Sequence, residues 1–401
     1  MGRKKIWVIS EFYYPELNST GYFLTTIAEH LAQKNDVSVI TAGVNNESSF
    51  KKNEIINNVI IHRVRNVNLD KNNKIQRILK LALITFRFAA KILRIVKKGD
   101  EVFCVTNPAF IILFIPLLKK IKKGINATIL VYDVFPENLH AVNFIKNDSL
   151  IFRVLQKLYN WSYNQFDNVI TIGRDMQDVF FEKMPKNHKK IKMITNWAEN
   201  NTVIPERKGD NVIIKELGIE KPIVIQFAGN IGRAQGFEKL IPIIASCDPK
   251  KFHFLFIGGG AYFDELESYL SHNNIEHISL LNSLPRSEQN IFLNACDIGL
   301  ITLNSKMYGL GVPSKSYNIL ASGKPILLIS DSNSEIALMV KEEKVGWVVG
   351  NEEISEIPGL LNKISDSKEM MIEMGKRARL LAEGKYSRNA ILDKYTTLYN
   401  K

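Results

Sequence analysis

The sequence has 401 residues, of which 45% are hydrophobic and 23% charged, so it is long enough for two domains and does not fit the disordered or fibrous classes. The excess behind its net charge of +12 lies in residues 1–200, which hold 30 Lys and Arg against 17 Asp and Glu, compared with 23 against 24 in the remainder. A basic half is compatible with nucleic acid, a membrane or a phosphorylated acceptor, and composition does not choose among them.

The first half alternates predicted strands and helices. It begins with a strand at residues 6–10 and lacks the apolar length of a signal peptide, so we expect a cytoplasmic protein. A helix is predicted at 21–33, where the apolar residues share one face. Further strands are predicted at 37–41, 59–64, 101–106, 127–132, 168–172 and 191–194. This alternation indicates a parallel sheet with helices on both sides.

Residues 75–98 predict a helix that is rich in both apolar and basic residues. At 100° per residue the basic side chains form one narrow stripe beside a broad apolar face. The stripe consists of Arg77, Lys80, Arg87, Lys91, Arg94 and Lys98. Such a helix suits the interface of an anionic membrane, and it equally suits a mostly buried core helix with one solvated edge. The apolar run at 110–118 is too short to cross a bilayer.

The same alternation restarts in the second half. Strands are predicted at 222–228, 252–257, 275–280, 297–302, 325–329 and 346–349. The polar run at 200–221, which contains Pro205, is the predicted linker. We therefore expect two doubly wound α/β domains, at 1–200 and 201–385, with a C-terminal helix at 386–401 that packs back on the first domain.

Two loops of the second half favour phosphate. Residues 309–325 combine glycines, a helix start near Pro313 and the charge of Lys315, and a helix N-terminus with free N–H groups attracts anions. We interpret this segment as a diphosphate-binding site. The loop at 227–236 also joins a strand to a helix and carries Arg233, which can bind phosphate oxygens bidentately, although its glycines can also serve a turn alone.

Two polar loops of the first half follow predicted strands and open on the same edge of the sheet. Residues 13–21 end at Gly21, whose backbone is a candidate donor. Residues 132–138 carry Asp133 and Glu137, which are candidate acid, base or hydroxyl-binding groups. Helix capping is the alternative for Glu137, because acidic residues near a proline commonly begin helices.

Several other classes of site are disfavoured. The seven histidines show no paired ligand spacing and the three cysteines are scattered, so we predict no metal site and no disulfide framework. Neither 229–236 nor 257–260 has the three-glycine spacing of a dinucleotide site. No Gly-x-Ser-x-Gly elbow indicates a hydrolase.

Five motifs, in this order, resemble the GT-B glycosyltransferases, most closely the family 4 branch that builds bacterial surface polysaccharides. They lie at residues 14–21, 133–137, 195–199, 229–236 and 312–325. The resemblance implies two Rossmann-like domains that face each other across a cleft. It also implies that the C-terminal domain binds the nucleotide-sugar and the N-terminal domain binds the acceptor.

The resemblance implies a role for individual residues. Arg233 and Lys315 would stabilise the leaving diphosphate, and Asp133 would orient acceptor or donor hydroxyls. Further donor-binding residues would be Gly21, Gly232, Leu284, Arg286, Gly309, Gly311, Ser314 and Asn318, and acceptor-binding residues would be Tyr14, Glu16 and Glu137. Asn318 stands where many family 4 enzymes carry a glutamate that binds the ribose, so the identity of the donor stays open.

We therefore expect a retaining glycosyltransferase that needs neither metal nor cofactor. Its donor would be a UDP-sugar carrying an N-acetylated or deoxy hexosamine. Its acceptor would be lipid-linked or another glycan, reached by peripheral contact with an anionic membrane at the cytoplasmic face, without nucleic acid as a partner. A nucleotide-sugar 2-epimerase of the same fold is one alternative, and a non-catalytic carbohydrate- or membrane-binding partner is another.

Overall fold

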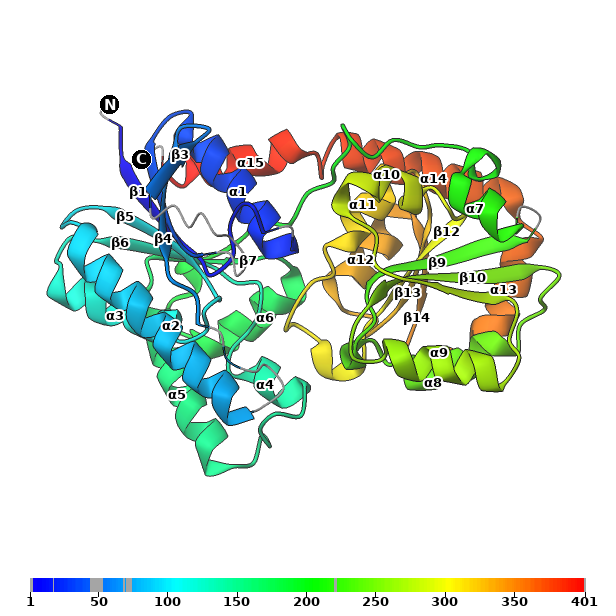
Figure 1. Ribbon diagram of the computed structural model, residues 1–401, viewed down its shortest axis with the longest axis horizontal. Coiled ribbons are helices and arrows are strands. Elements are labelled where there is room, and N and C mark those ends of the chain that lie inside the picture. The colour runs from blue at the N-terminus through cyan, green and yellow to red at the C-terminus, as the bar shows by residue number, and fades with distance from the viewer. Residues whose placement is uncertain are drawn as a thin grey trace. The chain divides into compact units, whose positions relative to one another are not determined.

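The computed structural model describes residues 3–16, 18–43, 53–67, 69, 74–219 and 222–399, without the side chains of 74, 75 and 77. Three parts of the predictions therefore lie outside the described residues: Leu17 of the predicted loop at 13–21, Glu220 and Lys221 of the predicted linker, and the Arg77 side chain. The chain forms two compact units (Figure 1). Unit 1 comprises Met1–Ile194, Gly309–Gly311 and Leu392–Lys401, and unit 2 comprises Thr195–Tyr308 and Val312–Ile391.

Over its described residues, unit 1 contains an eight-stranded sheet in the order β3-β4-β2-β1-β5-β6-β7-β8. The strands are β1 (Lys5–Ile9), β2 (Asp36–Ala42), β3 (Asn53–Ile56), β4 (Val59–Val64), β5 (Glu101–Val105), β6 (Asn126–Leu130), β7 (Asn168–Thr171) and β8 (Ile191–Met193). Every pairing is parallel except that of β3 with β4. The sequence predicted all of these strands but β3, a four-residue edge strand without a buried side chain.

The helices of unit 1 lie on both faces of this sheet (Figure 1). They are α1 (Ser19–Ala32), α2 (Lys74–Ile95), α3 (Ile111–Ile121), α4 (Glu137–Ala141), α5 (Leu150–Gln165), α6 (Arg174–Lys183) and the end of α15 (Arg388–Thr397). Within α15, the Tyr395 ring packs edge-on against Phe103 of β5, and the Thr396 hydroxyl is 3.0 Å from Nε2 of His30. The C-terminal residues thus complete the core of unit 1.

Over its described residues, unit 2 contains a six-stranded parallel sheet in the order β11-β10-β9-β12-β13-β14. The strands are β9 (Ile223–Asn230), β10 (Phe252–Gly259), β11 (Ile278–Leu281), β12 (Ile298–Thr302), β13 (Ile326–Ile329) and β14 (Gly346–Val349). The helices are α7 (Val212–Leu217), α8 (Phe237–Ala245), α9 (Phe263–His272), α10 (Gln289–Leu293), α11 (Lys315–Ala321), α12 (Glu335–Glu343), α13 (Ile357–Ser365) and α14 (Lys368–Glu383).

In each sheet the strand order reverses at one place. This place lies between β1 and β5 in unit 1 and between β9 and β12 in unit 2. Connections leave such a switch point in opposite directions and open a crevice at the carboxyl ends of the strands, where open α/β sheets bind ligands. In unit 2 the loop after β9 carries Arg233, and the connection after β12 leads to Lys315.

Residues 195–199 belong to unit 2, so the units divide a few residues before the boundary that we predicted at 200. The backbone N–H of Ala198 donates to the carbonyl of Tyr386 over 2.8 Å. The buried Trp197 donates its indole N–H to the Glu199 carboxylate over 2.6 Å. The first contact ties the segment to the connection between α14 and α15, and the second is internal to the segment. Across the described ranges, no helix combines the length and hydropathy needed to cross a membrane.

Candidate active site

Lys315 is the first residue of α11 and lies at the switch point of unit 2. Its Nζ sits 3.4 Å from the centre of the Phe227 ring, and Phe227 is fully buried in β9. The ring face attracts the ammonium group, whereas the loss of water disfavours its charge. Burial lowers the pKa of Lys315 from 10.5 to about 7. The lysine is therefore placed where an arriving anion would restore its charge.

Gly229 makes room for this lysine. A Cβ atom at Gly229 would lie 2.9 Å from the Lys315 Nζ, and the φ angle of Gly229 is +140°. Only glycine accepts this backbone conformation without strain. The close approach of the β9 backbone and the lysine therefore depends on the missing side chain.

We expect Gly229→Ala to displace Lys315 and to lower kcat/KM about 10²-fold, because a misplaced catalytic group loses much of its effect. Steady-state kinetics on the purified variant measures this loss. Gly218→Ala, at another left-handed glycine of unit 2 with open space around its Cβ, controls for backbone strain alone. Equal losses in both variants would contradict the assigned role of Gly229.

Arg233 opens the short 3₁₀ turn η3 (Arg233–Gln235) after β9. The turn is held by two contacts from the end of β12: the Thr302 hydroxyl donates to the Gln235 carbonyl over 2.6 Å, and Asn304 N–H donates to the Ala234 carbonyl over 2.9 Å. The Arg233 side chain is exposed and makes no hydrogen bond or ion pair with any residue in the described part of the chain. Its guanidinium is therefore available to a ligand.

Unit 2 also carries the other residues for which we predict contacts with the sugar donor, at several places along its sheet. Ser314 is the N-cap of α11, which has only seven residues, so the helix dipole is short and the charge of Lys315 matters more. The N–H of Gly232 is already used, because it donates to the Gln235 side chain over 3.2 Å. Leu284 and Arg286 follow β11, at the outer edge of the sheet. Their contact with a nucleobase stays a prediction.

Gly309 and Gly311 belong to unit 1 rather than to the unit that carries Lys315. Between them, the Leu310 carbonyl accepts a hydrogen bond from Val134 N–H over 3.4 Å. The connection from β12 to α11 therefore leaves unit 2 for three residues and returns at Val312. Backbone contacts of Gly309 and Gly311 with a diphosphate stay a prediction.

Asn318 is buried in α11. Its Oδ1 accepts a hydrogen bond from Glu199 N–H over 3.0 Å and so ties the segment 195–199 to this helix. This contact indicates a structural role for the side-chain oxygen. The hydrogen bond with Glu199 does not test the predicted contact of Asn318 with the ribose, which stays a prediction.

The loop after β1 in unit 1 holds Tyr14 and Glu16, and Gly21 lies in the first turn of α1, which follows this loop. Tyr14 is exposed, and its carbonyl accepts from the Arg63 guanidinium over 2.7 Å. The Glu16 carboxylate is 3.5 Å from the Asn18 amide. The Gly21 N–H donates to Oδ1 of Asn18, the N-cap of α1, over 2.8 Å. For the Gly21 N–H to bind the nucleotide-sugar, it would have to give up its hydrogen bond to the Asn18 side chain, which caps α1.

Asp133 follows β6, the neighbour of β5 in the sheet. Its Oδ1 accepts from the Asn138 amide over 2.8 Å, and its N–H donates to the Thr106 hydroxyl over 3.3 Å. Burial raises the pKa of the Asp133 carboxyl above its ordinary value, against hydrogen bonds from Asn138 and Asn107. A carboxyl of raised pKa beside amide donors is suited to bind a sugar hydroxyl.

Glu137 begins α4 but forms an ion pair rather than a cap. Its Oε1 lies 2.6 Å from Nζ of Lys183, which is buried and also donates to the Asn160 side chain over 2.9 Å. Burial lowers the pKa of Lys183, and the Glu137 charge opposes this shift. Glu137 is thus part of the packing between α4, α5 and α6. Its predicted contact with an acceptor stays untested.

Two comparisons bear on the family. The family model described as "Glycosyl transferases group 1" matches residues 210–381, which lie in unit 2 except for Gly309–Gly311 and include Arg233 and Lys315. The whole chain is similar to a protein of Pseudomonas aeruginosa named "Probable glycosyltransferase WbjE": 31% identity over 392 residues, covering 98% of this chain and 96% of the relative. This chain belongs to the group 1 glycosyltransferases.

Solved structures agree on the fold of this glycosyltransferase. A sucrose-phosphate synthase from Thermosynechococcus elongatus superposes with a TM-score of 0.78 at 13% identity, over 99% of this chain and 98% of that chain. Anabaena HepE, solved in complex with UDP-glucose, gives 0.72 at 13% identity, over 98% and 99%. The fold predicted from the sequence, a GT-B protein with two Rossmann-like domains, is confirmed, and so is its assignment as a glycosyltransferase.

Some residues that contact the candidate site residues were not singled out from the sequence. Phe227 lies in a buried strand, so its pattern predicts only core packing. Thr106 and Asn107 follow β5 at the switch point of unit 1, a position from which they could have been inferred. Within the described ranges, no group of three or more His, Cys, Asp or Glu side chains is arranged to hold a metal ion.

Proposed function

We propose that the protein transfers an N-acetylated or deoxy hexosamine from a UDP-sugar to a lipid-linked acceptor in surface polysaccharide synthesis, with retention of the anomeric configuration and without a metal or cofactor. The family is that of the group 1 glycosyltransferases. A structure of similar fold, HepE, is described in complex with UDP-glucose, which supports a nucleotide-sugar donor.

The observation that carries the proposal is the pair of cations at the switch point of unit 2. Lys315 lies against the Phe227 ring with its pKa lowered to about 7, and Arg233 is exposed on the turn after β9. A desolvated lysine is costly to hold in its charged form unless a ligand supplies negative charge, and the exposed Arg233 side chain can bind the same ligand. The diphosphate of a nucleotide-sugar has that charge.

The proposed chemistry is electrostatic. When the bond between the anomeric carbon and the diphosphate breaks, negative charge develops on the leaving phosphate oxygen. Arg233 donates hydrogen bonds to the diphosphate, and protonated Lys315 neutralises the growing charge in surroundings where water is scarce. The acceptor hydroxyl then bonds to the anomeric carbon from the side that the diphosphate leaves, and its proton passes to the departing phosphate oxygen. The charge of the two cations replaces that of a metal ion.

In this proposal unit 1 binds the acceptor. Asp133, with its raised pKa and its amide donors, orients a hydroxyl of the acceptor or the donor. Tyr14 is exposed in the loop after β1, where its ring can pack against a sugar. The basic first half of the sequence and the amphipathic helix α2 support an acceptor at the cytoplasmic face of an anionic membrane.

We expect Arg233→Ala to lower kcat/KM for the UDP-sugar about 10²-fold, because it removes a charge-assisted contact with the diphosphate. Titration of UDP by calorimetry should show weaker binding, while the melting temperature of the free protein stays unchanged. Lys239→Ala, at an exposed lysine on the helix that follows, is the matched control. Unchanged UDP affinity in Arg233→Ala would contradict the proposed diphosphate contact.

The function itself is tested by incubating the protein with a panel of UDP-sugars and a polyprenyl-linked acceptor. Transfer with the anomeric configuration of the donor retained, and undiminished by EDTA, is the expected result. Formation of an epimer from nucleotide-sugar alone would establish the epimerase instead. Binding of glycans without any turnover of nucleotide-sugar would establish the non-catalytic alternative.

A further inference from the structure

Large apolar side chains are exposed together on three helices of unit 1. Among the described residues, 23 large hydrophobic side chains are exposed, of which five lie on α2, two on α3 and five on α5. They are Ile78, Leu79, Leu83, Phe86, Leu93, Leu117, Ile121, Leu150, Ile151, Val154, Leu158 and Trp161. We call this surface the α2–α3–α5 face. Twelve of the 23 exposed large hydrophobic side chains among the described residues therefore lie on these three helices.

The apolar residues of α2 divide between two faces. One face, with Ile84, Phe88 and Ile92, is fully buried against the unit. The other faces solvent, and Phe86 on it is 72% exposed. The basic stripe predicted from the sequence runs along one side of this exposed face. A mostly buried core helix would not expose a large aromatic side chain, so the structure favours the interfacial interpretation of α2.

Helix α5 carries the most exposed part of the face. Leu150 is 76% and Ile151 65% exposed, and Val154, Leu158 and Trp161 continue on the same side of the helix at helical spacing. Arg153 and Lys157, both exposed, run beside them. This helix is thus amphipathic in the sense of a membrane-surface helix, with basic residues beside an apolar stripe.

Two contacts join the three helices into one surface. Lys120 of α3 lies over the ring of Trp161 of α5, 5.5 Å from its centre. Lys122, just after α3, donates to the carbonyls of Leu93 and Val96 at the end of α2. Leu117 and Ile121 of α3 are exposed between these contacts. Figure 1 shows α2 and α3 side by side on one face of the sheet. The exposed apolar residues are therefore contiguous.

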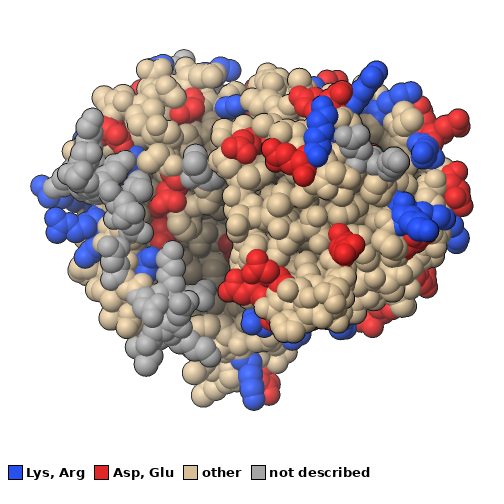
Figure 2. Space-filling model, turned by 45° about the vertical axis from the view of Figure 1, so that its right-hand side comes forward, with Lys and Arg blue, Asp and Glu red and all other residues tan. Residues whose placement is uncertain are grey.

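The charge of the face has one sign. Helices α2, α3 and α5 contain ten Lys and Arg and no Asp or Glu, six, two and two respectively. On the right-hand part of the surface drawn in Figure 2, by contrast, acidic and basic side chains are interspersed. Such a face would repel a second copy of itself and would attract an anionic surface.

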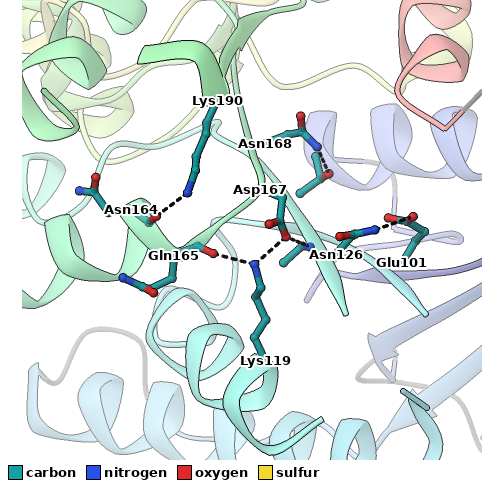
Figure 3. Close-up of polar contacts among 10 residues, drawn as sticks. Glu101, Lys119, Asn126, Asn164, Gln165, Asp167, Asn168 and Lys190 are labelled. Atoms are coloured by element: carbon teal, nitrogen blue, oxygen red, sulfur yellow. Dashed lines mark hydrogen bonds and ion pairs between the residues drawn. The ribbon is translucent and has the colours of Figure 1, made fainter. Parts of the chain in front are cut away.

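Some of these cations already serve the fold. Figure 3 shows Lys119 donating to the Gln165 carbonyl at the end of α5 over 2.8 Å and to the Asp167 carboxylate over 2.6 Å. Arg87 donates to the carbonyls of Arg65 and Asn66 over 2.6 and 2.8 Å. Substitutions there would disturb unit 1. Other cations of the face are exposed and can contact an external partner: Arg94, Lys120, Lys123, Arg153 and Lys157.

We propose that the α2–α3–α5 face docks the protein on an anionic lipid surface, with Leu150, Ile151 and Phe86 entering the interface and the surrounding cations at the headgroups. This inference extends the use of a lipid-linked acceptor proposed above, since a docked unit 1 meets its acceptor in the plane of the membrane. It also adds α3 and α5 to the helix at 75–98 that the sequence singled out, and Leu150 of α5 is the most exposed side chain of the face.

The test is sedimentation with vesicles of phosphatidylcholine containing about 30% phosphatidylglycerol, without donor or acceptor. Leu150→Ser/Ile151→Ser should weaken binding at least about tenfold, because two large apolar side chains no longer enter the interface. Lys120→Gln/Lys123→Gln should weaken it less and remove part of its salt dependence. The matched control is Ile372→Ser/Leu380→Ser on α14 of unit 2, whose side chains are equally exposed and should not matter.

The inference is overturned if the Leu150→Ser/Ile151→Ser variant binds the anionic vesicles as well as the control variant does. It is also overturned if the native protein binds vesicles of pure phosphatidylcholine as well as it binds the anionic vesicles. A native dimer that dissociates in this variant, with vesicle binding unchanged, would assign the face to a second copy instead. UDP binding, measured on the same samples, should be unaffected by the variant. This readout separates a failure of the docking surface from a failure of the proposed function.

Discussion

Replacing Lys315 by methionine will lower kcat about 10²- to 10³-fold and, in the absence of ligand, stabilise the protein against heat. The first effect follows from the loss of the charge that neutralises the leaving diphosphate. The second follows because methionine can occupy the space against Phe227 without the desolvation that lowers the pKa of Lys315 to about 7. Kinetics and thermal unfolding of the same preparation measure both effects.

The stabilisation will depend on pH. The pKa of Lys315 is about 7 in the folded protein and near 10.5 in the unfolded chain, so the unfolded chain binds the proton more tightly. The penalty that Lys315 imposes on folding is therefore complete at and below pH 7 and shrinks as the pH rises toward 10, by about 1.4 kcal/mol for each unit. The difference in melting temperature between Lys315→Met and the native protein should shrink over the same range.

Lys239→Met provides the control, because this lysine is exposed in the same unit and should change neither turnover nor the pH dependence of stability. If Lys315→Met keeps the native turnover, Lys315 does not stabilise the leaving diphosphate. A melting-temperature difference that does not vary between pH 7 and 10 would show that the ammonium is not desolvated in the folded protein.

Lys183→Met will cost about 3–5 kcal/mol of stability, the largest loss that we expect from one substitution in unit 1. The substitution leaves the Glu137 carboxylate without the cation that it contacts at 2.6 Å, in surroundings where only 20% of the Glu137 side chain is exposed. Urea unfolding of unit 1, followed by the fluorescence of a tryptophan in that unit, measures the loss. Lys183→Met/Glu137→Leu should recover most of it, since no unpaired charge remains.

The exposed pair Lys376 and Glu373 on α14 offers a control, because their side chains are 65% and 55% exposed and their ion pair should contribute little. A loss in Lys183→Met no larger than that in Lys376→Met would contradict the structural role of the Glu137 ion pair. Glu137→Gln, assayed for KM of the acceptor at unchanged kcat, then asks separately whether this side chain also touches the acceptor.

The alternation of strands and helices in both halves, and the loops that end them, could be predicted from local pattern. Buried parallel strands are continuous apolar runs, and their carboxyl-end loops carry the glycine and polar residues that a switch point uses. Arg233, Lys315 and Asp133 were proposed in this way, and the structure places them after β9, β12 and β6. The edge strand β3 was missed because its four residues bury no side chain and so show no apolar pattern.

The sequence by itself determined the fold class, the family and the loops that carry charge, because these depend on the order and type of neighbouring residues. Only the tertiary structure decided which neighbours those residues have. It places Lys315 on Phe227, turns Asn318 and Glu137 toward internal partners, and leaves the apolar residues of α5 uncovered. The physical reason is that desolvation, pairing and exposure depend on which distant segments pack against a side chain, and periodicity along one helix or strand does not contain that information.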